Sequence, residues 1–499
     1  MSLSYIYFVL NTVIGMFMSA FVIRTVGQTD YGVFQSMSAF ISYLIILEFG
    51  TGTIMARNIS LCKKDGTDNL DIQKNVSTIW SLTIILGLVI LLFSVGFWCL
   101  IDTIYSKSLS ADQIILGKKL FAFAAINLIL SFLTQTLNGL ILGYEYYSFE
   151  KTVAIAKLLL RSALVVILLK INPSVVLLVT IDTVLALVVF LCSLLFCILK
   201  IKVKFVFRYF DAGIFKLITP LALAMFLQTI VNTANGNVDK FLISIMMKPE
   251  NVAIYSVAMA MFMMFSSIAT LPVTMFMPQI ASNMRNGLEG QRLTETLVQP
   301  CRLNIIVTGI IGFGFLSVGR PFIQILYGTN YSDAWLYAMV VIMPMFFNMF
   351  NAVIINVVDV MRKRHVRSLI LMATTTLNIA LTIIGIRRIG MLGAALATGI
   401  SLILQTIFLN VWYKRKININ IEFLICKSFK GIILWLLFST LVSSVVQIFI
   451  DKEILKFLVG GVVFVTVFSL LFLKCGANDV EKNKIKQIIS GFVKKMINY

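Results

Sequence analysis

The sequence predicts an all-α polytopic membrane protein with about fourteen transmembrane helices. Of its 499 residues, 59% are hydrophobic and only 13% are charged, whereas a soluble protein is about half apolar and about a quarter charged. Apolar runs follow one another along the chain, each long enough for the ~20 residues that cross a bilayer. Basic residues gather in alternate connecting segments. This composition excludes a disordered chain, a soluble multidomain enzyme and a coiled-coil rod.

Short polar breaks of no more than about twenty residues separate the apolar runs, which leaves no room for a soluble catalytic domain. The first run has no basic leader or cleavage site before Arg24, so it is interpreted as a retained span and not as a signal peptide. The fourteen spans are expected near residues 3–23, 33–56, 76–101, 120–142, 152–169, 174–199, 217–236, 252–280, 303–319, 334–358, 368–386, 390–413, 429–450 and 454–473.

The basic residues predict the orientation. Segments that follow even-numbered spans, with the tail and adjoining span edges, hold 28 Lys and Arg, whereas segments that follow odd-numbered spans hold 12. The positive-inside rule therefore predicts that both termini lie in the cytoplasm. The net charge of +20 is accordingly interpreted as a basic cytoplasmic surface, with no nucleic-acid partner. The runs Lys200–Arg208, Arg362–Arg367 and Lys414–Lys416 are interpreted as orientation anchors in preference to ligand sites.

Metal, disulfide and nucleotide chemistry have no support in the sequence. The seven cysteines are scattered without a CxxC pair, and His365 is the only histidine, so neither a structural zinc site nor a disulfide framework is expected. Gly312–Gly314 lies inside a span with no preceding strand, and no Walker sequence is present. We therefore expect no cofactor, no metal and no catalytic residues.

A weak internal repeat predicts two halves. Tyr31–Phe34 opens the second span and Val252–Tyr255 opens the eighth, and these runs end in Ala56–Asn58 and Ala281–Asn283. Such repeats are common in transporters, where the transport path lies between the halves. The expected organisation is a six-helix lobe at 1–210, a second at 211–415, two additional transmembrane helices at 416–475 and a cytoplasmic amphipathic tail at 476–499. In the tail, apolar residues recur at helical spacing between lysines.

Several segments resemble a known family. Gly32–Arg57, which contains Leu47–Gly52, is similar to the second-span signature of Wzx-type oligosaccharide flippases, in the multidrug/oligosaccharidyl-lipid/polysaccharide exporter (MOP) superfamily. Further similar segments, in the same order along nearly the whole chain, are Asn237–Phe241, Ala253–Ala258, Pro278, Gly319–Phe322, Tyr327–Gly328 and Gly390–Ala395. The first span departs from the pattern because it starts without the usual basic leader.

The resemblance implies a flippase with two six-helix lobes around a central cavity that opens alternately to each side. Its cargo would be undecaprenyl-diphosphate-linked oligosaccharide, moved from the cytoplasmic to the outer face of a bacterial cell membrane for capsule, exopolysaccharide or O-antigen synthesis. Its partners would be membrane lipids and the polymerase and glycosyltransferases of the same pathway. A peptidoglycan-precursor flippase, a multidrug/cation antiporter and, from another class, a membrane polysaccharide polymerase remain alternatives.

Charged residues within the spans are the first candidates for cargo contacts, because such charges are costly in lipid and usually face a cavity or a partner. Arg161 lies deep in the fifth span, and Lys157 shares its helix face four residues earlier. Asp182 lies as far after the turn near Asn172–Pro173 as Arg161 lies before it, so the two are expected at one depth. Arg161 is interpreted either as a structural ion pair or as part of a cationic cavity wall.

Other polar residues complete the candidate site. Glu48 in the second span is a candidate for proton or cation coupling, or alternatively a cap or a partner for a cation. Arg24 could bind phosphate at the exit side or anchor the helix at the interface. Asn232 and Asn235 suit sugar hydroxyls, although asparagines also join membrane helices to one another. Asp239 and Lys240 are interpreted as a local structural pair.

Overall fold

The protein folds into helices throughout its described length. The computed structural model describes residues 2–64, 68–203, 209–361, 363–479 and 481–483, and no strand occurs in these ranges. Each of the fourteen predicted spans falls on one helix or on consecutive helical segments, which confirms the all-α prediction. Among the described residues, twelve helices are long and apolar enough to cross a membrane. The bent pair α15 (Ile421–Phe429) and α16 (Ile433–Ile448) makes a thirteenth, and α8 carries a shorter apolar stretch, Ala212–Leu227.

The chain divides into two compact units, which we name the N-terminal unit (Met1–Ser256) and the C-terminal unit (Val257–Tyr499). The boundary falls within α9 (Pro249–Met275), later in the chain than the lobe boundary expected after residue 210. The reason is that α8 (Ala212–Met246) packs on α2, α3 and α4 and so groups with the first unit.

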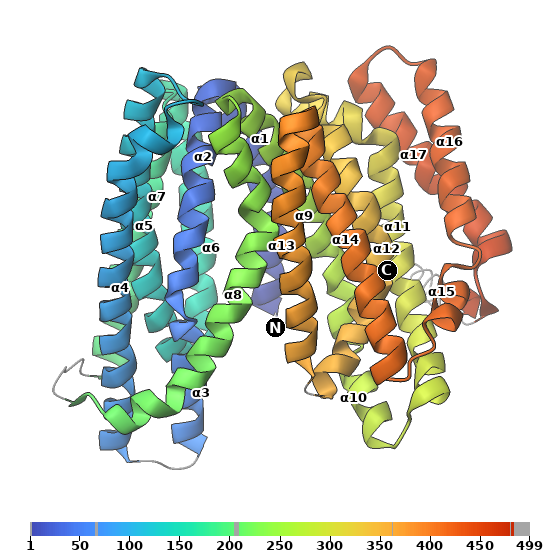
Figure 1. Cartoon of the computed structure of the whole chain (residues 1–499). Helices are drawn as coiled ribbons and strands as arrows, with labels where there is room; N and C mark the ends of the chain where they lie inside the picture. Colours follow the sequence, from blue (N-terminus) through green and yellow to red (C-terminus); the bar gives the residue numbers. More distant parts are fainter. Residues whose placement is uncertain (1, 65–67, 204–208, 362, 480, 484–499) are drawn as a thin grey trace, which may run out of the picture. The chain divides into compact units, whose positions relative to one another are not determined.

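The long helix α5 lies at the centre of the N-terminal unit, where it contacts α2, α3, α4, α6 and α7 (Figure 1). Besides α8, the elements of this unit are α1 (Ser2–Val26), α2 (Gln28–Leu44), η1 (Ile45–Glu48), α3 (Thr51–Lys64), α4 (Asn69–Tyr105), α5 (Ala111–Gly143), α6 (Tyr147–Ile171), α7 (Val175–Phe196) and η2 (Cys197–Ile201). Ser110 caps α5 with a reciprocal capping box formed with Gln113, which satisfies exposed backbone groups at that end of the helix.

The helix α11 has the same central role in the C-terminal unit, because it contacts α12, α15, α16 and α17. The two additional C-terminal spans therefore pack directly on this unit. Besides α15 and α16, its elements are α10 (Met277–Arg285), α11 (Gly290–Tyr327), η4 (Thr329–Tyr331), α12 (Ala334–Val360), α13 (Arg364–Ile389), α14 (Met391–Lys416), α17 (Glu453–Leu471) and η5 (Phe472–Gly476).

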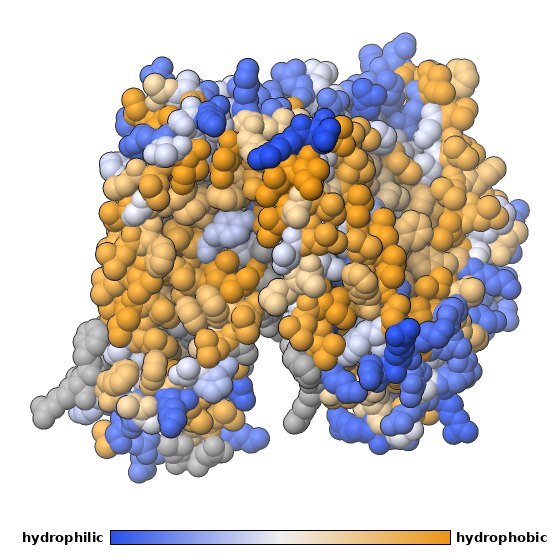
Figure 2. Space-filling view, in the orientation of Figure 1, coloured by the Kyte–Doolittle hydropathy of each residue, from blue (hydrophilic) through white to orange (hydrophobic). Residues whose placement is uncertain are grey.

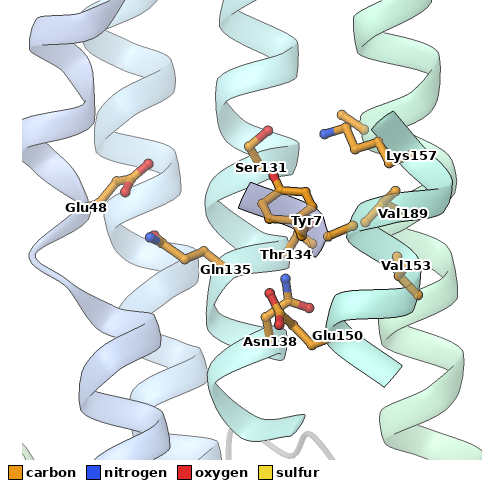
Figure 3. Close-up of a pocket in the computed structure, with 12 residues that line it drawn as sticks. Tyr7, Glu48, Ser131, Thr134, Gln135, Asn138, Glu150, Val153, Lys157 and Val189 are labelled. Atoms are coloured by element: carbon orange, nitrogen blue, oxygen red, sulfur yellow. The ribbon is translucent and has the colours of Figure 1, made fainter. Parts of the chain in front are cut away.

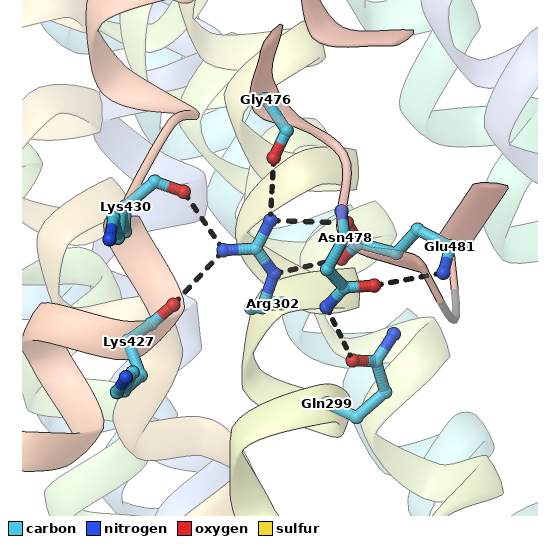
Figure 4. Close-up of polar contacts among 7 residues, drawn as sticks. All are labelled: Gln299, Arg302, Lys427, Lys430, Gly476, Asn478 and Glu481. Carbon is cyan, nitrogen blue, oxygen red and sulfur yellow. Dashed lines mark hydrogen bonds and ion pairs between the residues drawn. The ribbon is translucent and has the colours of Figure 1, made fainter.

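Arg302 on α11 joins three separate parts of the C-terminal unit (Figure 4). Its guanidinium donates to both carboxylate oxygens of Glu481, at 2.8 and 3.1 Å, and to the carbonyl oxygens of Lys427, Lys430 and Gly476. Arg302 and Glu481 are only 4% and 7% exposed. All five guanidinium protons therefore have acceptors, which is the condition for a buried arginine to be tolerated. The remainder of the expected tail helix, 484–499, lies outside the described residues.

The surface of each unit is suited to a bilayer. On the face shown in Figure 2, hydrophobic residues cover the middle of each unit and hydrophilic residues gather toward its two ends. Many large apolar side chains are exposed, among them Leu92, Leu217 and Leu441. In water such a surface would be an aggregation hazard, whereas in lipid it is the expected exterior. The chain is a multi-pass membrane protein.

Candidate functional site

A polar cavity of about 350 Å³ lies within the N-terminal unit (Figure 3). Its walls come from α1, η1, α5, α6 and α7. The lining residues are Tyr7, Glu48, Ser131, Thr134, Gln135, Asn138, Glu150, Val153, Ala154, Lys157, Ala186 and Val189. Eight of these twelve side chains are polar or charged. Such a concentration around a cavity between membrane helices indicates a site for a polar ligand, because polar groups at membrane depth are otherwise costly.

Glu48 reaches this cavity because the second predicted span is broken. The 3₁₀ segment η1 ends at Glu48, and the next two residues, Phe49 and Gly50, have φ angles of 50° and 66°. The ring of Phe49 stacks on that of Phe226 of α8, with ring centroids 4.4 Å apart. A side chain on Gly50 would meet the Met225 sulfur at 2.5 Å. Irregular backbone at membrane depth is tolerated where it lines a cavity, and this break turns Glu48 toward one.

The residues of α5 that line the cavity were not among the candidates predicted from the sequence. Ser131, Thr134, Gln135 and Asn138 recur at the three- and four-residue spacing that places side chains on one face of a helix. The side-chain amide of Gln135 forms no hydrogen bond with any described residue. It points toward the side of the cavity where Glu48 lies (Figure 3). The signal that could have revealed this stripe was its helical period within an otherwise apolar span.

Close packing of α3 against α5 holds this polar stripe in position. A Cβ atom on Gly139 would lie 2.1 Å from the Gly52 carbonyl oxygen, so the two backbones touch. Beside this contact, the hydroxyls of Thr51 and Thr136 are hydrogen-bonded at 2.8 Å. Small residues and interhelical hydroxyl bonds are the usual means of joining membrane helices.

The α6 wall carries the charges of the cavity, since Glu150, Val153, Ala154 and Lys157 also share a helix face. The Glu150 carboxylate lies 3.0 Å from the Lys151 ammonium, which in turn lies 5.6 Å from the centroid of the Tyr7 ring. Lys157 forms no ion pair or hydrogen bond with any described residue, and the same holds for Glu48. The cavity therefore presents an ammonium group and a carboxyl group that have no partner in the part of the chain that the structure describes.

Arg161 and Asp182 form a two-point ion pair between α6 and α7. Arg161 Nε lies 2.5 Å from Asp182 Oδ1, and Nη2 lies 2.9 Å from Oδ2. Their side chains are 33% and 24% exposed, and neither lines the cavity. This pairing favours the interpretation of Arg161 as a structural ion pair. Lys157 lines the cavity, whereas Arg161 does not.

The remaining sequence candidates are Arg24, Asn232, Asn235 and Asp239. Arg24 is exposed in the last turn of α1 and is not part of the cavity lining. The side chains of Asn232 and Asn235 on α8 lie outside the described residues. Asp239 accepts a hydrogen bond of 2.9 Å from the Tyr255 hydroxyl. In the described ranges, no group of three or more His, Cys, Asp or Glu side chains could hold a metal ion.

Solved structures of transporters share this fold. A structure titled lipid II flippase MurJ, in an inward closed conformation, has a TM-score of 0.72 at 16% identity, covering 95% of this chain and 99% of that chain. An inward-facing multidrug resistance MATE family transporter of the MOP superfamily has a TM-score of 0.60 at 14% identity, covering 81% and 94%. A search of curated proteins found no match. The fold is therefore that of MOP-superfamily transporters and flippases.

The family follows from a second comparison. Residues 21–336, more than half of the chain, match the model of a family described as polysaccharide biosynthesis protein. The chain belongs to the polysaccharide biosynthesis protein family. The family resemblance predicted from the second-span signature and the later motifs is thereby confirmed.

Proposed function

We propose that this protein is a flippase for undecaprenyl-diphosphate-linked oligosaccharide, working by alternating access. It would move each unit from the cytoplasmic to the outer face of the bacterial cell membrane, for capsule, exopolysaccharide or O-antigen synthesis. Glycosyltransferases would build the unit, and a polymerase would consume it. The chain would have both termini in the cytoplasm, as the distribution of Lys and Arg favours.

The observation that carries this proposal is the polar cavity among apolar helices in a member of a polysaccharide biosynthesis family. A lipid-linked sugar needs a polar route for its head group, while its hydrocarbon tail can stay in the bilayer. Lys157, which has no hydrogen bond or ion pair with any described residue, lies at the wall of this cavity and supports a polar cargo, since a charge at this position otherwise has a high desolvation cost.

The other candidate residues have proposed roles around this route. The diphosphate would compete with Asp182 for the Arg161 guanidinium, because both are bidentate oxygen acceptors. Arg24 would meet phosphate at the exit side, and Asn232 and Asn235 would contact sugar hydroxyls. Glu48 would couple transport to a proton or cation.

The proposed driving force is the membrane potential or an ion gradient, without nucleotide hydrolysis. A diphosphate carries roughly two negative charges, and its outward movement is favoured by about 4.6 kcal/mol per 100 mV if both charges cross uncompensated. A proton or cation bound at Glu48 would accompany the empty carrier on its return, because positive charge moves inward down the same potential.

The test is a flipping assay in proteoliposomes that hold the purified full-length protein. Fluorescent undecaprenyl-diphosphate-linked oligosaccharide is placed in one leaflet, and its arrival in the other is measured under an imposed potential. A peptidoglycan precursor and a cationic dye are run as competing cargoes. We expect potential-dependent movement of the oligosaccharide. Preference for the precursor or the dye, or a strict requirement for ATP, would overturn the proposal.

A further inference from the structure

We infer that the cavity of the N-terminal unit is a binding site for a neutral, hydroxyl-rich sugar ring of the cargo, and that the diphosphate binds elsewhere. This inference rests on the proposed function and assigns a ligand chemistry to one site within it. It is carried by the composition of the cavity wall and by the pairing of the charges around it.

The uncharged groups of the wall match sugar hydroxyls, which both donate and accept hydrogen bonds. The Ser131 and Thr134 hydroxyls donate to neighbouring groups on their own helix and keep their acceptor lone pairs for a ligand. Gln135 and Asn138 supply amide groups, although the Asn138 oxygen also accepts a hydrogen bond from Ser193, and Tyr7 supplies a phenol. Figure 3 shows these groups distributed around one space, with Tyr7 between the α5 and α6 side chains in the view. A site of this kind offers a partner to several hydroxyls on one ring.

The charged groups of the wall disfavour a diphosphate. Two carboxyl groups, Glu48 and Glu150, line the cavity together with Lys157, and Lys151 compensates Glu150 from beside it. With Glu48 ionised, the charges of these four residues sum to zero, so a ligand with two negative charges would lie near Glu48 without enough cations. Arg161, the other deep cation of α6, is already bound by Asp182 outside the cavity lining.

The size of the cavity agrees with a single ring. Its volume of about 350 Å³ is near the lower end of the range for small-molecule sites, about 300–1,000 Å³. That volume suits one sugar unit with its substituents better than an extended oligosaccharide. The rigid contact of α3 with α5 keeps the polar stripe in place before a ligand arrives, which reduces the ordering cost of binding.

The experiment uses the purified full-length protein in nanodiscs and measures saturation-transfer NMR with three probes: glucose, N-acetylglucosamine and inorganic pyrophosphate. The test variant is Gln135→Leu, which removes a cavity amide that has no side-chain hydrogen bond with any described residue. The matched control is Gln405→Leu, the same change in a membrane helix of the C-terminal unit. Circular dichroism and thermal unfolding establish that both variants are folded.

We expect at least one sugar to bind, with its apparent affinity reduced about fivefold or more by Gln135→Leu and changed less than about twofold by Gln405→Leu. Pyrophosphate would not compete with the sugar. No saturation transfer to either sugar, an unchanged affinity in Gln135→Leu, or displacement of the sugar by pyrophosphate would overturn the inference.

Failure of this inference can be distinguished from failure of the proposed function. If wild-type protein flips lipid-linked oligosaccharide but neither sugar binds, the sugar site is wrong and the flippase proposal stands. If sugar binding depends on Gln135 but no lipid-linked oligosaccharide is flipped, the site stands and the proposed transport is wrong.

Discussion

The Arg161 guanidinium and the Asp182 carboxylate bind each other at two points, across the hairpin formed by α6 and α7. The pair accounts for two charges at membrane depth and leaves Lys157 as the α6 cation that faces the cavity. Its role in stability and the role of Lys157 in transport can therefore be separated by mutation.

Replacing Asp182 with Leu is expected to destabilise the protein by about 1–3 kcal/mol, because Arg161 is left uncompensated among membrane helices. The full cost of breaking a deeply buried pair is reduced here by the partial exposure of both side chains. The measurement is thermal unfolding in nanodiscs. A double variant, Arg161→Leu with Asp182→Leu, should recover much of the loss. A single variant as stable as wild type would show that the pair contributes nothing.

Lys157→Met is expected to slow flipping by about tenfold or more, since it removes the unpaired ammonium of the cavity, and to leave the fold intact. Lys170→Met, at the end of the same helix and exposed, is the matched control and should retain the wild-type rate. Both rates are measured in proteoliposomes at equal protein density. Equal rates for the two variants would remove Lys157 from the transport route.

Gly50→Ala is expected to lower stability by about 1–2 kcal/mol, because an L side chain in the left-handed region carries that strain. The added Cβ would also press on Met225. Gly96→Ala is the control, since a Cβ there meets nothing within 4 Å and alanine favours a helix. Its unfolding temperature should be unchanged or higher. If Gly50→Ala behaves like Gly96→Ala, the break after Glu48 is not under strain.

Glu48→Gln is expected to make the flipping rate insensitive to an imposed ion or proton gradient, while flipping driven by electrical potential alone persists. The substitution keeps the size of the side chain and removes its ability to bind and release a cation. Initial rates are compared with and without each gradient. A variant that keeps the wild-type response to every gradient would exclude Glu48 as the coupling group.

Arg302→Met is expected to destabilise the C-terminal unit by about 3–5 kcal/mol, because Glu481 is left buried without its partner. Limited proteolysis should then cut between α15 and α17 sooner than in wild type. The control variant Arg415→Met, changed at an exposed site, should be cleaved by the protease at the wild-type rate. The double variant Arg302→Met with Glu481→Met should be more stable than Arg302→Met alone. A protease-resistant Arg302→Met protein would contradict the role assigned to this cluster.

The sequence predicted those features that depend on local pattern. Every expected span is helical, with the second and eighth each divided between consecutive helices, because about 20 apolar residues are sufficient to specify a membrane helix. The matched depth of Arg161 and Asp182 followed from their equal distances to the turn at Asn172–Pro173, and the structure contains their ion pair. Glu48 and Lys157 were both singled out as charges within predicted spans, and both line one cavity.

What the sequence did not predict depends on contacts between distant segments. At the break after Glu48, Phe49 stacks on Phe226 of α8, and nothing near Phe49 in the sequence indicates that partner. Arg302 was counted only among the orientation charges, because its acceptor Glu481 lies 179 residues away. The polar stripe on α5, by contrast, does not depend on a distant segment. Its helical period is present in the sequence, but it lies within a mainly apolar span and was not recognised.

The Arg302 cluster has a consequence for the timing of biosynthesis. Arg302 is made long before any of its acceptors, the nearest of which lies 125 residues further along the chain and the last 179. At about 5–20 residues per second, those 179 residues take ~9–36 s to synthesise. During that interval the guanidinium depends on water, lipid phosphates or the insertion machinery for hydrogen bonds. Segments synthesised well after α11 therefore complete the contacts of Arg302, and a chain shortened before Glu481 would expose an unsatisfied cation to quality-control proteases.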